Sequence, residues 1–112
     1  MKRGEIWWAS LAEPKGSSPG YRRPVVIIQA NDFNESRIQT VIVAAITSNL
    51  RLVNAPGNFA VSSRGTGLSK KSVVNVSQLL TLSKSLLTQR IGRLDGSSAQ
   101  RLDDGLRLVL VL

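Results

Sequence analysis

Two uninterrupted apolar runs, at residues 25–28 and 41–46, place the tightest constraint on how this chain folds. Both are apolar on each face of an extended chain, so each predicts a strand that lies inside a sheet. The segments around them are short and are punctuated by Gly, Pro, Ser and Asn. This rhythm predicts a small, curled β domain with few helices.

The same pattern predicts the individual elements, with a turn at residues 31–34 and a loop at residues 50–58. The expected strands cover residues 5–9, 24–30, 40–46, 59–62, 72–76, 78–82 and 91–94, where 72–76 and 78–82 could be one bent strand. Asp95 predicts the N-cap of a C-terminal helix, because its carboxylate can accept from the free amides of the next turn. Apolar residues recur behind it at helical spacing, at Ala99, Leu102, Leu106 and Val109. Residues 106–112 also alternate, so the last turns could be extended, but a helix is favoured. Gly105 should weaken that helix by about 1 kcal/mol relative to Ala.

Length and composition exclude several kinds of chemistry. At 112 residues, the chain is expected to form one domain. It contains no cysteine and no histidine, which excludes disulfides, thiolate metal sites and the commonest general base. Any catalysis must therefore use Arg, Lys, Thr, Ser, Tyr or a carboxylate. The N-terminus lacks the apolar core of a signal peptide, and no run approaches a membrane span, so we expect a cytoplasmic protein without a membrane partner.

The charge balance favours a polyanionic partner. Fifteen Lys and Arg stand against seven Asp and Glu, a formal charge of +8, and ten of the fifteen cations are Arg. Arg favours bidentate contacts with phosphate, and a basic surface speeds the capture of polyanions. Nucleic acid or an acidic protein is the favoured partner, with general solubility or attraction to anionic lipid as the alternatives.

An arginine lies at the junction between a Gly/Ser/Pro-rich segment, residues 13–20, and the first apolar run. Because it precedes Pro24, Arg23 is pushed towards extended geometry, and its side chain should project from the strand entrance. A cation in that place can grip a phosphodiester, although it could equally cap the edge of the sheet. Arg22 should point to the opposite face and serve another purpose.

Polar groups at the end of the second apolar run form another candidate site. The hydroxyls of Thr47 and Ser48 could donate to a phosphate oxygen, or could instead cap their own turn. Gln78 could lie beside them, or its amide could be satisfied by backbone. Trp7 and Trp8 should face opposite sides of a strand; an exposed Trp could stack a base or fill a subunit interface, unless both are core.

The sequence predicts no metal site and no cofactor. The acidic residues show neither metal-ligand spacing nor a paired-carboxylate pattern, and the glycines form no phosphate-binding loop. These scattered acidic residues include Asp32, Glu35, Asp95, Asp103 and Asp104.

Taken in order, these motifs make the chain resemble the MazF/PemK family of toxin endoribonucleases over essentially its whole length. The specific segments are Arg-Pro-Val at residues 23–25 and Ile-Thr-Ser at residues 46–48. The weaker ones cover residues 3–8, 14–20, 67–68, 72–74 and 91–94, together with Asn34 and Gln78. The chain departs from the family pattern at Ser18 and Ser77, where an acidic residue is common.

The resemblance implies a small SH3-like barrel with a C-terminal helix, spanning residues 1–112 as one toxin domain and assembling as a homodimer. It implies sequence-specific cleavage of single-stranded mRNA and neutralisation by a small acidic antitoxin. It assigns Arg23 and Thr47 as the catalytic pair. Substrate contacts are expected from Ser17, Tyr21, Ser48 and Gln78.

The implied reaction agrees with the composition, because RNA carries its own nucleophile in the ribose 2′-hydroxyl. An enzyme without histidine, cysteine or metal can act by positioning that hydroxyl and stabilising the phosphorane, which leaves a 2′,3′-cyclic phosphate and a 5′-hydroxyl. Two alternatives stay open at this stage: a CcdB-like toxin that poisons gyrase on the same fold, and an RNA-binding module that does not cleave.

Overall fold

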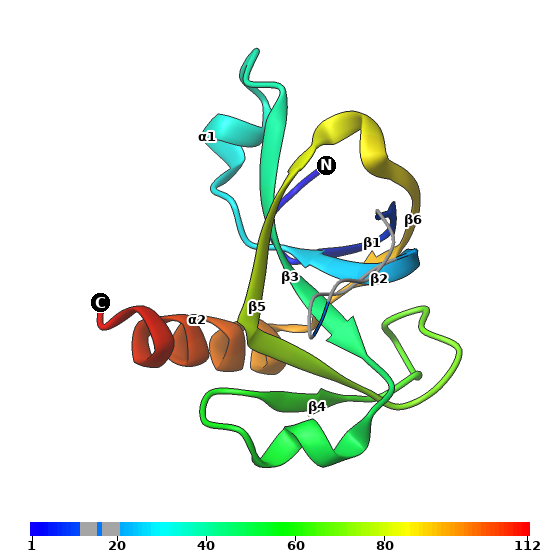
Figure 1. Cartoon of the computed structure of the whole chain (residues 1–112), viewed down its shortest axis with the longest axis vertical. Coiled ribbons are helices and arrows are strands. Elements are labelled where there is room, and N and C mark those ends of the chain that lie inside the picture. The colour runs from blue at the N-terminus through cyan, green and yellow to red at the C-terminus, as the bar shows by residue number, and fades with distance from the viewer. Residues whose placement is uncertain (12–15, 17–20) are drawn as a thin grey trace.

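Six antiparallel strands form one curved sheet, a half-barrel, in the order β4-β5-β3-β2-β1-β6 (Figure 1). The computed structural model describes residues 1–11, 16 and 21–112. Its elements in chain order are β1 (Glu5–Ser10), β2 (Arg22–Ile27), α1 (Asn31–Asn34), β3 (Thr40–Thr47), the 3₁₀ helix η1 (Leu50–Asn54), β4 (Phe59–Val61), β5 (Ser72–Ser83), the 3₁₀ helix η2 (Lys84–Leu86), β6 (Leu87–Arg93) and α2 (Gly96–Leu110). The expected mainly β fold with a C-terminal helix is confirmed.

The two apolar runs form the centre of the sheet, as predicted. β2 lies between β1 and β3, and β3 lies between β2 and β5. Val25, Val26 and Ile27 are fully buried, because both faces of β2 are covered. Pro24 lies where the pairing with β3 has already ended, so its missing amide hydrogen removes no hydrogen bond on that side.

Two apolar clusters fill the two faces of the sheet. The first includes Ile6, Val26, Ala44 and Ile46, and α2 covers it through Leu102 and Leu106. The second packs on the other face. Its members are Ala9, Val25, Ile27, Val41, Val43, Leu82 and Leu87. In Figure 1, β3 and β5 run side by side through the molecule while α2 lies beside β5.

Several element boundaries differ from the expected ones. The turn expected at residues 31–34 is a single helical turn, α1, and the loop expected at residues 50–58 begins with η1. In the C-terminal half, β5 is one strand with a register shift opposite Ala44 and Ala45, which is the bent strand that we left open. The last strand begins at Leu87, four residues earlier than expected, because Leu87 pairs with Ala9 of β1.

The C-terminal helix begins where Asp95 predicts. The Asp95 side chain accepts a hydrogen bond from the Ser98 amide at 2.8 Å. That hydrogen bond holds the pKa of the Asp95 carboxyl below its ordinary value. Gly105 has a packing role that propensity alone did not indicate: a Cβ there would collide with the Gly57 carbonyl oxygen, so only glycine lets α2 approach this closely.

Candidate active site

A pocket of about 220 Å³ opens where β1, β2 and β3 end near the residues 68–72 segment. Its lining residues are Trp8, Arg22, Arg23, Pro24, Ile46, Ser48, Leu68, Ser69, Lys70 and Ser72. Three of these side chains are cationic, and none of these ten described lining residues carries a carboxylate. The pocket is therefore suited to an anionic ligand.

Arg23 and Thr47 lie just beyond the paired part of β2 and β3. The β2–β3 pairing ends with Val25 opposite Ala45, and Arg23 and Thr47 each lie two residues past that last pair, at the same end of the sheet. Arg23 lines the pocket, whereas Thr47 is not among its lining residues. Arg23 is exposed and Thr47 is half-buried, so both side chains can reach a ligand at this end of the sheet.

Thr47 also takes part in the turn that follows β3. Its Oγ1 accepts a hydrogen bond from the Asn49 amide at 3.1 Å. The capping role considered for this hydroxyl is therefore real. It does not exclude a second role, because a hydroxyl that accepts a hydrogen bond still has its own hydrogen to donate.

The other expected substrate contacts lie in different places. Ser48 is exposed and lines the pocket beside Arg23. Gln78 does not line it: Val73 pairs with Thr47, and Gln78 lies five positions further along β5. Ser17 lies outside the described residues.

Tyr21 stands immediately before β2 in an unusual backbone conformation. Its φ is +57°, in the left-handed region that favours glycine, and its side chain is 59% exposed. The carbonyl of Tyr21 accepts a hydrogen bond from the Leu11 amide at 2.6 Å, which fixes the residue against β1. Such strain in an exposed aromatic residue is typical of functional sites.

Sequence reasoning missed the contact between Arg22 and Trp8. The Arg22 Cζ lies 4.2 Å from the centroid of the Trp8 ring, within the range of a cation–π interaction. Trp7 packs instead against the second apolar cluster, on the other side of β1. The expected alternation of the two Trp side chains is confirmed, but finding the arginine partner required the β1–β2 register, which pairs Trp8 with Pro24.

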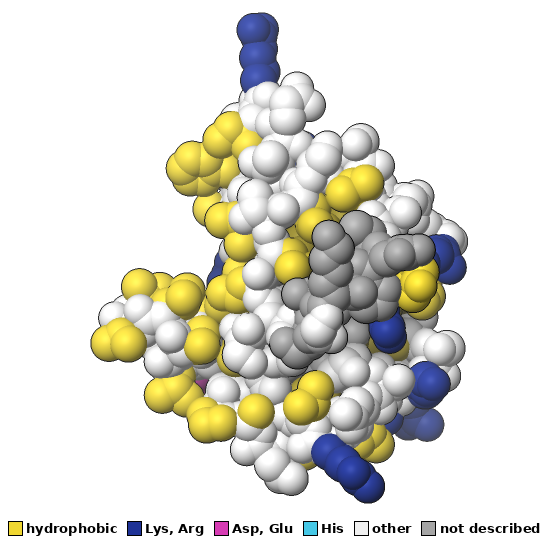
Figure 2. Space-filling model, viewed as in Figure 1, with side chains coloured by type: hydrophobic (Ala, Val, Ile, Leu, Met, Phe, Trp, Pro, Cys, Tyr) yellow, Lys and Arg dark blue, Asp and Glu magenta, His cyan; other side chains and the backbone are white. Residues whose placement is uncertain are grey.

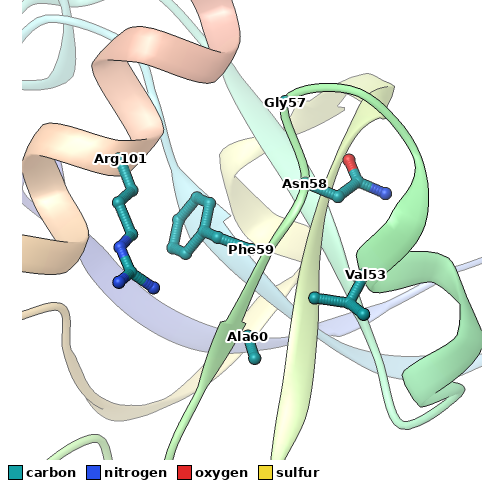
Figure 3. A pocket seen from close by; sticks show the side chains of 6 residues that line it. All are labelled: Val53, Gly57, Asn58, Phe59, Ala60 and Arg101. Carbon is teal, nitrogen blue, oxygen red and sulfur yellow. The ribbon is translucent and has the colours of Figure 1, made fainter.

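A second pocket, of about 370 Å³, lies between α2 and the η1–β4 segment (Figure 3). Arg101 is its one cation among the described lining residues, and Phe59 and Val53 supply apolar surface. The Asn58 amide is engaged within the fold, since its nitrogen donates to the Leu52 carbonyl and its oxygen accepts from the Val76 amide. This pocket lacks the clustered cations and hydroxyls of the first.

Two further observations concern metals and membranes. Within the part of the chain that the structure describes, no three His, Cys, Asp or Glu side chains are grouped so as to hold a metal ion. No helix among those residues is both long and apolar enough to span a bilayer.

Comparison with known proteins gives a consistent result. Residues 2–110 match the model of a family described as the PemK-like, MazF-like toxin of type II toxin-antitoxin systems. The endoribonuclease MazF6 of Mycobacterium tuberculosis (strain H37Rv) is 47% identical over 112 residues, which is 100% of this chain and 98% of that protein.

Solved structures of similar proteins have the same architecture. The M. tuberculosis toxin MazF-mt6 superposes with a TM-score of 0.80 at 25% identity, covering 96% of this chain and 97% of that one. A mycobacterial endoribonuclease in complex with its cognate antitoxin gives a TM-score of 0.82 at 20% identity, over 100% of this chain and 96% of that one.

Proposed function

The chain belongs to the PemK-like, MazF-like toxin family of type II toxin–antitoxin systems, and we propose that it is a metal-independent, sequence-specific endoribonuclease that cleaves single-stranded mRNA with Arg23 and Thr47 as its catalytic pair. The observation that supports the catalytic assignment is that the paired parts of β2 and β3 end together, two residues from Arg23 and from Thr47, next to a cationic pocket that Arg23 lines. The toxin domain spans residues 1–112 and acts in the cytoplasm, where mRNA is translated.

The proposed reaction uses the nucleophile that RNA provides. The ribose 2′-oxygen forms a new bond to phosphorus while the bond from phosphorus to the 5′-oxygen breaks. The 2′-hydroxyl gives up its proton, and the leaving 5′-oxygen gains one. The products are a 2′,3′-cyclic phosphate and a 5′-hydroxyl.

Each member of the pair stabilises charge in the transition state. A guanidinium stays protonated at physiological pH, so Arg23 acts electrostatically on the phosphorane oxygens and not as a base. The Thr47 hydroxyl donates a hydrogen bond to the same phosphate group. Ser48 and Tyr21 hold the neighbouring nucleotides, and Ser17 and Gln78 make further contacts with the RNA.

The test is cleavage of single-stranded RNA by the purified protein in EDTA. We expect fragments that end in a 2′,3′-cyclic phosphate, and no fragments from an all-2′-deoxy substrate of the same sequence. Equal cleavage of the deoxy substrate would refute the mechanism. A gyrase-poisoning function of the CcdB type is not supported, because the matched relative is an endoribonuclease.

The proposed regulator is a small acidic antitoxin that competes with RNA. The formal charge of +8 supports this proposal, as does the complex of a similar endoribonuclease with its cognate antitoxin. Stoichiometric inhibition that weakens at high salt is the expected result. Inhibition that leaves RNA binding unchanged would contradict competition.

The proposed assembly is a homodimer. The last turn of α2 and the two residues after it carry exposed apolar side chains, at Leu108, Val109, Leu110, Val111 and Leu112. Figure 2 shows hydrophobic side chains gathered on the left, where α2 ends, while Lys and Arg side chains gather on the lower right. A surface of this kind is typical of a protein interface. Sedimentation should give a dimer at micromolar concentration, and a monomer there would contradict the assembly.

A further inference from the structure

Arg22 and Trp8 form a stacked pair on the wall of the pocket that also holds Arg23. The Arg22 Cζ lies 4.2 Å from the centre of the Trp8 ring. An Arg22 terminal nitrogen, Nη2, donates to the Gln89 Oε1 at 3.4 Å. The exposed guanidinium is therefore positioned by contacts with two neighbours.

Three strands supply this arrangement. The β1–β2 register pairs Trp8 with Pro24, next to Arg22, and the β1–β6 register pairs Trp8 with Gln89. The Trp8 ring and the Gln89 amide are both uncharged, so they restrain the orientation of the guanidinium without offsetting its positive charge. A restrained, planar cation differs from a mobile surface arginine, because less side-chain entropy is lost when a ligand binds.

We propose that Trp8 and Arg22 form a base-binding subsite, in which one unpaired nucleobase of the RNA stacks on the Arg22 guanidinium while the Trp8 indole supports it from behind. The inference rests on the proposed endoribonuclease function. Guanidinium planes and aromatic rings are the groups on which proteins stack the splayed bases of single-stranded RNA. Arg22 is thus a specificity-determining residue, distinct from the catalytic role of Arg23.

The rest of the pocket fits the same ligand. The exposed hydroxyls of Ser48 and Ser69 line it and can hydrogen-bond to the polar edge of a base. Such hydrogen bonds can distinguish one base from another, which stacking alone would not do. Lys70 lines it as well and offers a point charge to the adjoining phosphate. A base held here lies next to Arg23, so the nucleotide involved is expected to adjoin the cleaved bond.

The decisive variant is Arg22→Lys, which keeps the charge and removes the planar face. The wild type and the variant each cleave a random-sequence RNA pool, and the nucleotide preference at every position around the cut is measured. We expect the variant to lose about tenfold of the preference at one position adjoining the cut, with the other positions and the salt dependence unchanged. The matched control is Arg37→Lys, an exposed arginine between α1 and β3, which should leave every position unchanged.

The outcomes separate this subsite from the reaction itself. Identical preferences in the wild type and Arg22→Lys would overturn the subsite while leaving the endoribonuclease proposal intact. Absence of cleavage by the wild type would refute the proposed function. In that case, the subsite is tested by measuring the affinity of the protein for uncleavable all-2′-deoxy oligonucleotides, each of which carries one abasic position. The subsite is supported if one abasic position lowers the affinity of the wild type by about tenfold and does not lower the affinity of Arg22→Lys. Equal losses of affinity in the two proteins, or no loss in either, would overturn the subsite.

Discussion

The two ends of β1 hold their cations in opposite ways. At the end near α2, Arg3 pairs with Asp103 at 2.9 Å and Arg90 pairs with Glu5 at 3.1 Å. At the pocket end, Arg22 contacts an indole ring and a neutral amide. The α2 end thus pairs Arg3 and Arg90 with carboxylates, and the pocket end positions Arg22 through two uncharged groups.

This difference shows why net charge alone does not locate a binding site. A cation that is paired with a carboxylate contributes little field at a distance, because the two charges nearly cancel. Lys70, Arg22 and Arg23 line a pocket whose ten described lining residues include no acid. The attraction for RNA is therefore expected to concentrate at the pocket end of the sheet.

The largest effect is expected from the proposed catalytic pair. Arg23→Ala and Thr47→Ala should each lower the cleavage rate by roughly 10²-fold, the cost of losing one donor to a developing anion. The free energy of unfolding should fall by no more than about 1 kcal/mol, since neither side chain is in the core and Thr47→Ala loses one turn hydrogen bond, from the Asn49 amide. Single-turnover cleavage and thermal melting measure the two quantities.

The matched control for this pair lies at the α2 end. Arg93→Ala removes an exposed arginine from the last residue of β6 without touching the pocket. Its cleavage rate should stay within about twofold of wild type. An equal loss of activity in Arg93→Ala and Arg23→Ala would contradict the prediction that the pocket end, and not the α2 end, serves cleavage.

The next largest effect concerns how tightly the α2 end is packed. In Gly105→Ala, helix propensity gains up to about 1 kcal/mol, but the new methyl group collides with the Gly57 backbone and the Val76 side chain. We expect a net loss of about 2 kcal/mol in the free energy of unfolding, as for an overpacked core.

Denaturant unfolding of Gly105→Ala should be compared with that of Gly96→Ala. Gly96 begins the same helix, and a Cβ there meets open space. This control should be neutral or slightly stabilising. A stabilised Gly105→Ala variant would show that propensity outweighs packing at this position.

The sequence predicted the fold well where one cause dominated. The two fully apolar runs were predicted as inner strands, and Asp95 was predicted as the N-cap of the C-terminal helix; both predictions are confirmed. The helical turn α1 was missed because it depends on tertiary contacts: the Lys84 Nζ donates to the Asn34 carbonyl at 3.0 Å, and the Asn31 Oδ1 accepts from the Arg3 amide at 2.7 Å. A local pattern contains no record of such a contact.

The roles of the candidate site residues stay predictions. Arg23, Thr47 and Ser48 were proposed from their positions at strand ends, and of these Arg23 and Ser48 line the pocket. The pair of Arg22 and Trp8 was not proposed, because it depends on the register between β1 and β2, which residue types alone do not specify. Gln78 was grouped with these residues, but it does not line this pocket.

Salt dependence offers a finer comparison of the two ends. Each phosphate contact made by a cation adds about 0.7 to the slope of log affinity against log salt concentration for single-stranded nucleic acid. Lys70→Ala should therefore reduce the slope by about 0.7. Arg90→Ala should leave it unchanged, because Arg90 is paired with Glu5. Fluorescence anisotropy with uncleavable RNA provides the measurement, and equal slopes in the two variants would contradict the prediction.

The smallest effect is a pH dependence at the α2 end. Burial acts to raise the pKa of the Glu5 carboxyl, but hydrogen bonds from the Lys2 amide and the Trp7 indole, together with the charge of Arg90, hold it below its ordinary value of 4.5. A carboxyl whose pKa is lowered by folding stabilises the protein above the unfolded-state pKa. That stabilisation is lost as the pH falls through the folded-state pKa.

Glu5→Gln should therefore be less stable than wild type at pH 7, by less than about 1 kcal/mol, and the difference should vanish in acid. The glutamine keeps an oxygen that can accept from Lys2 and Trp7 and loses only the charge facing Arg90. Urea unfolding at a series of pH values gives both curves, with exposed Glu35→Gln as the control. Parallel curves for wild type and Glu5→Gln would mean that the ion pair to Arg90 contributes nothing to the fold. The Arg3–Asp103 pair, and not the pair of Arg90 with Glu5, would then stabilise the α2 end.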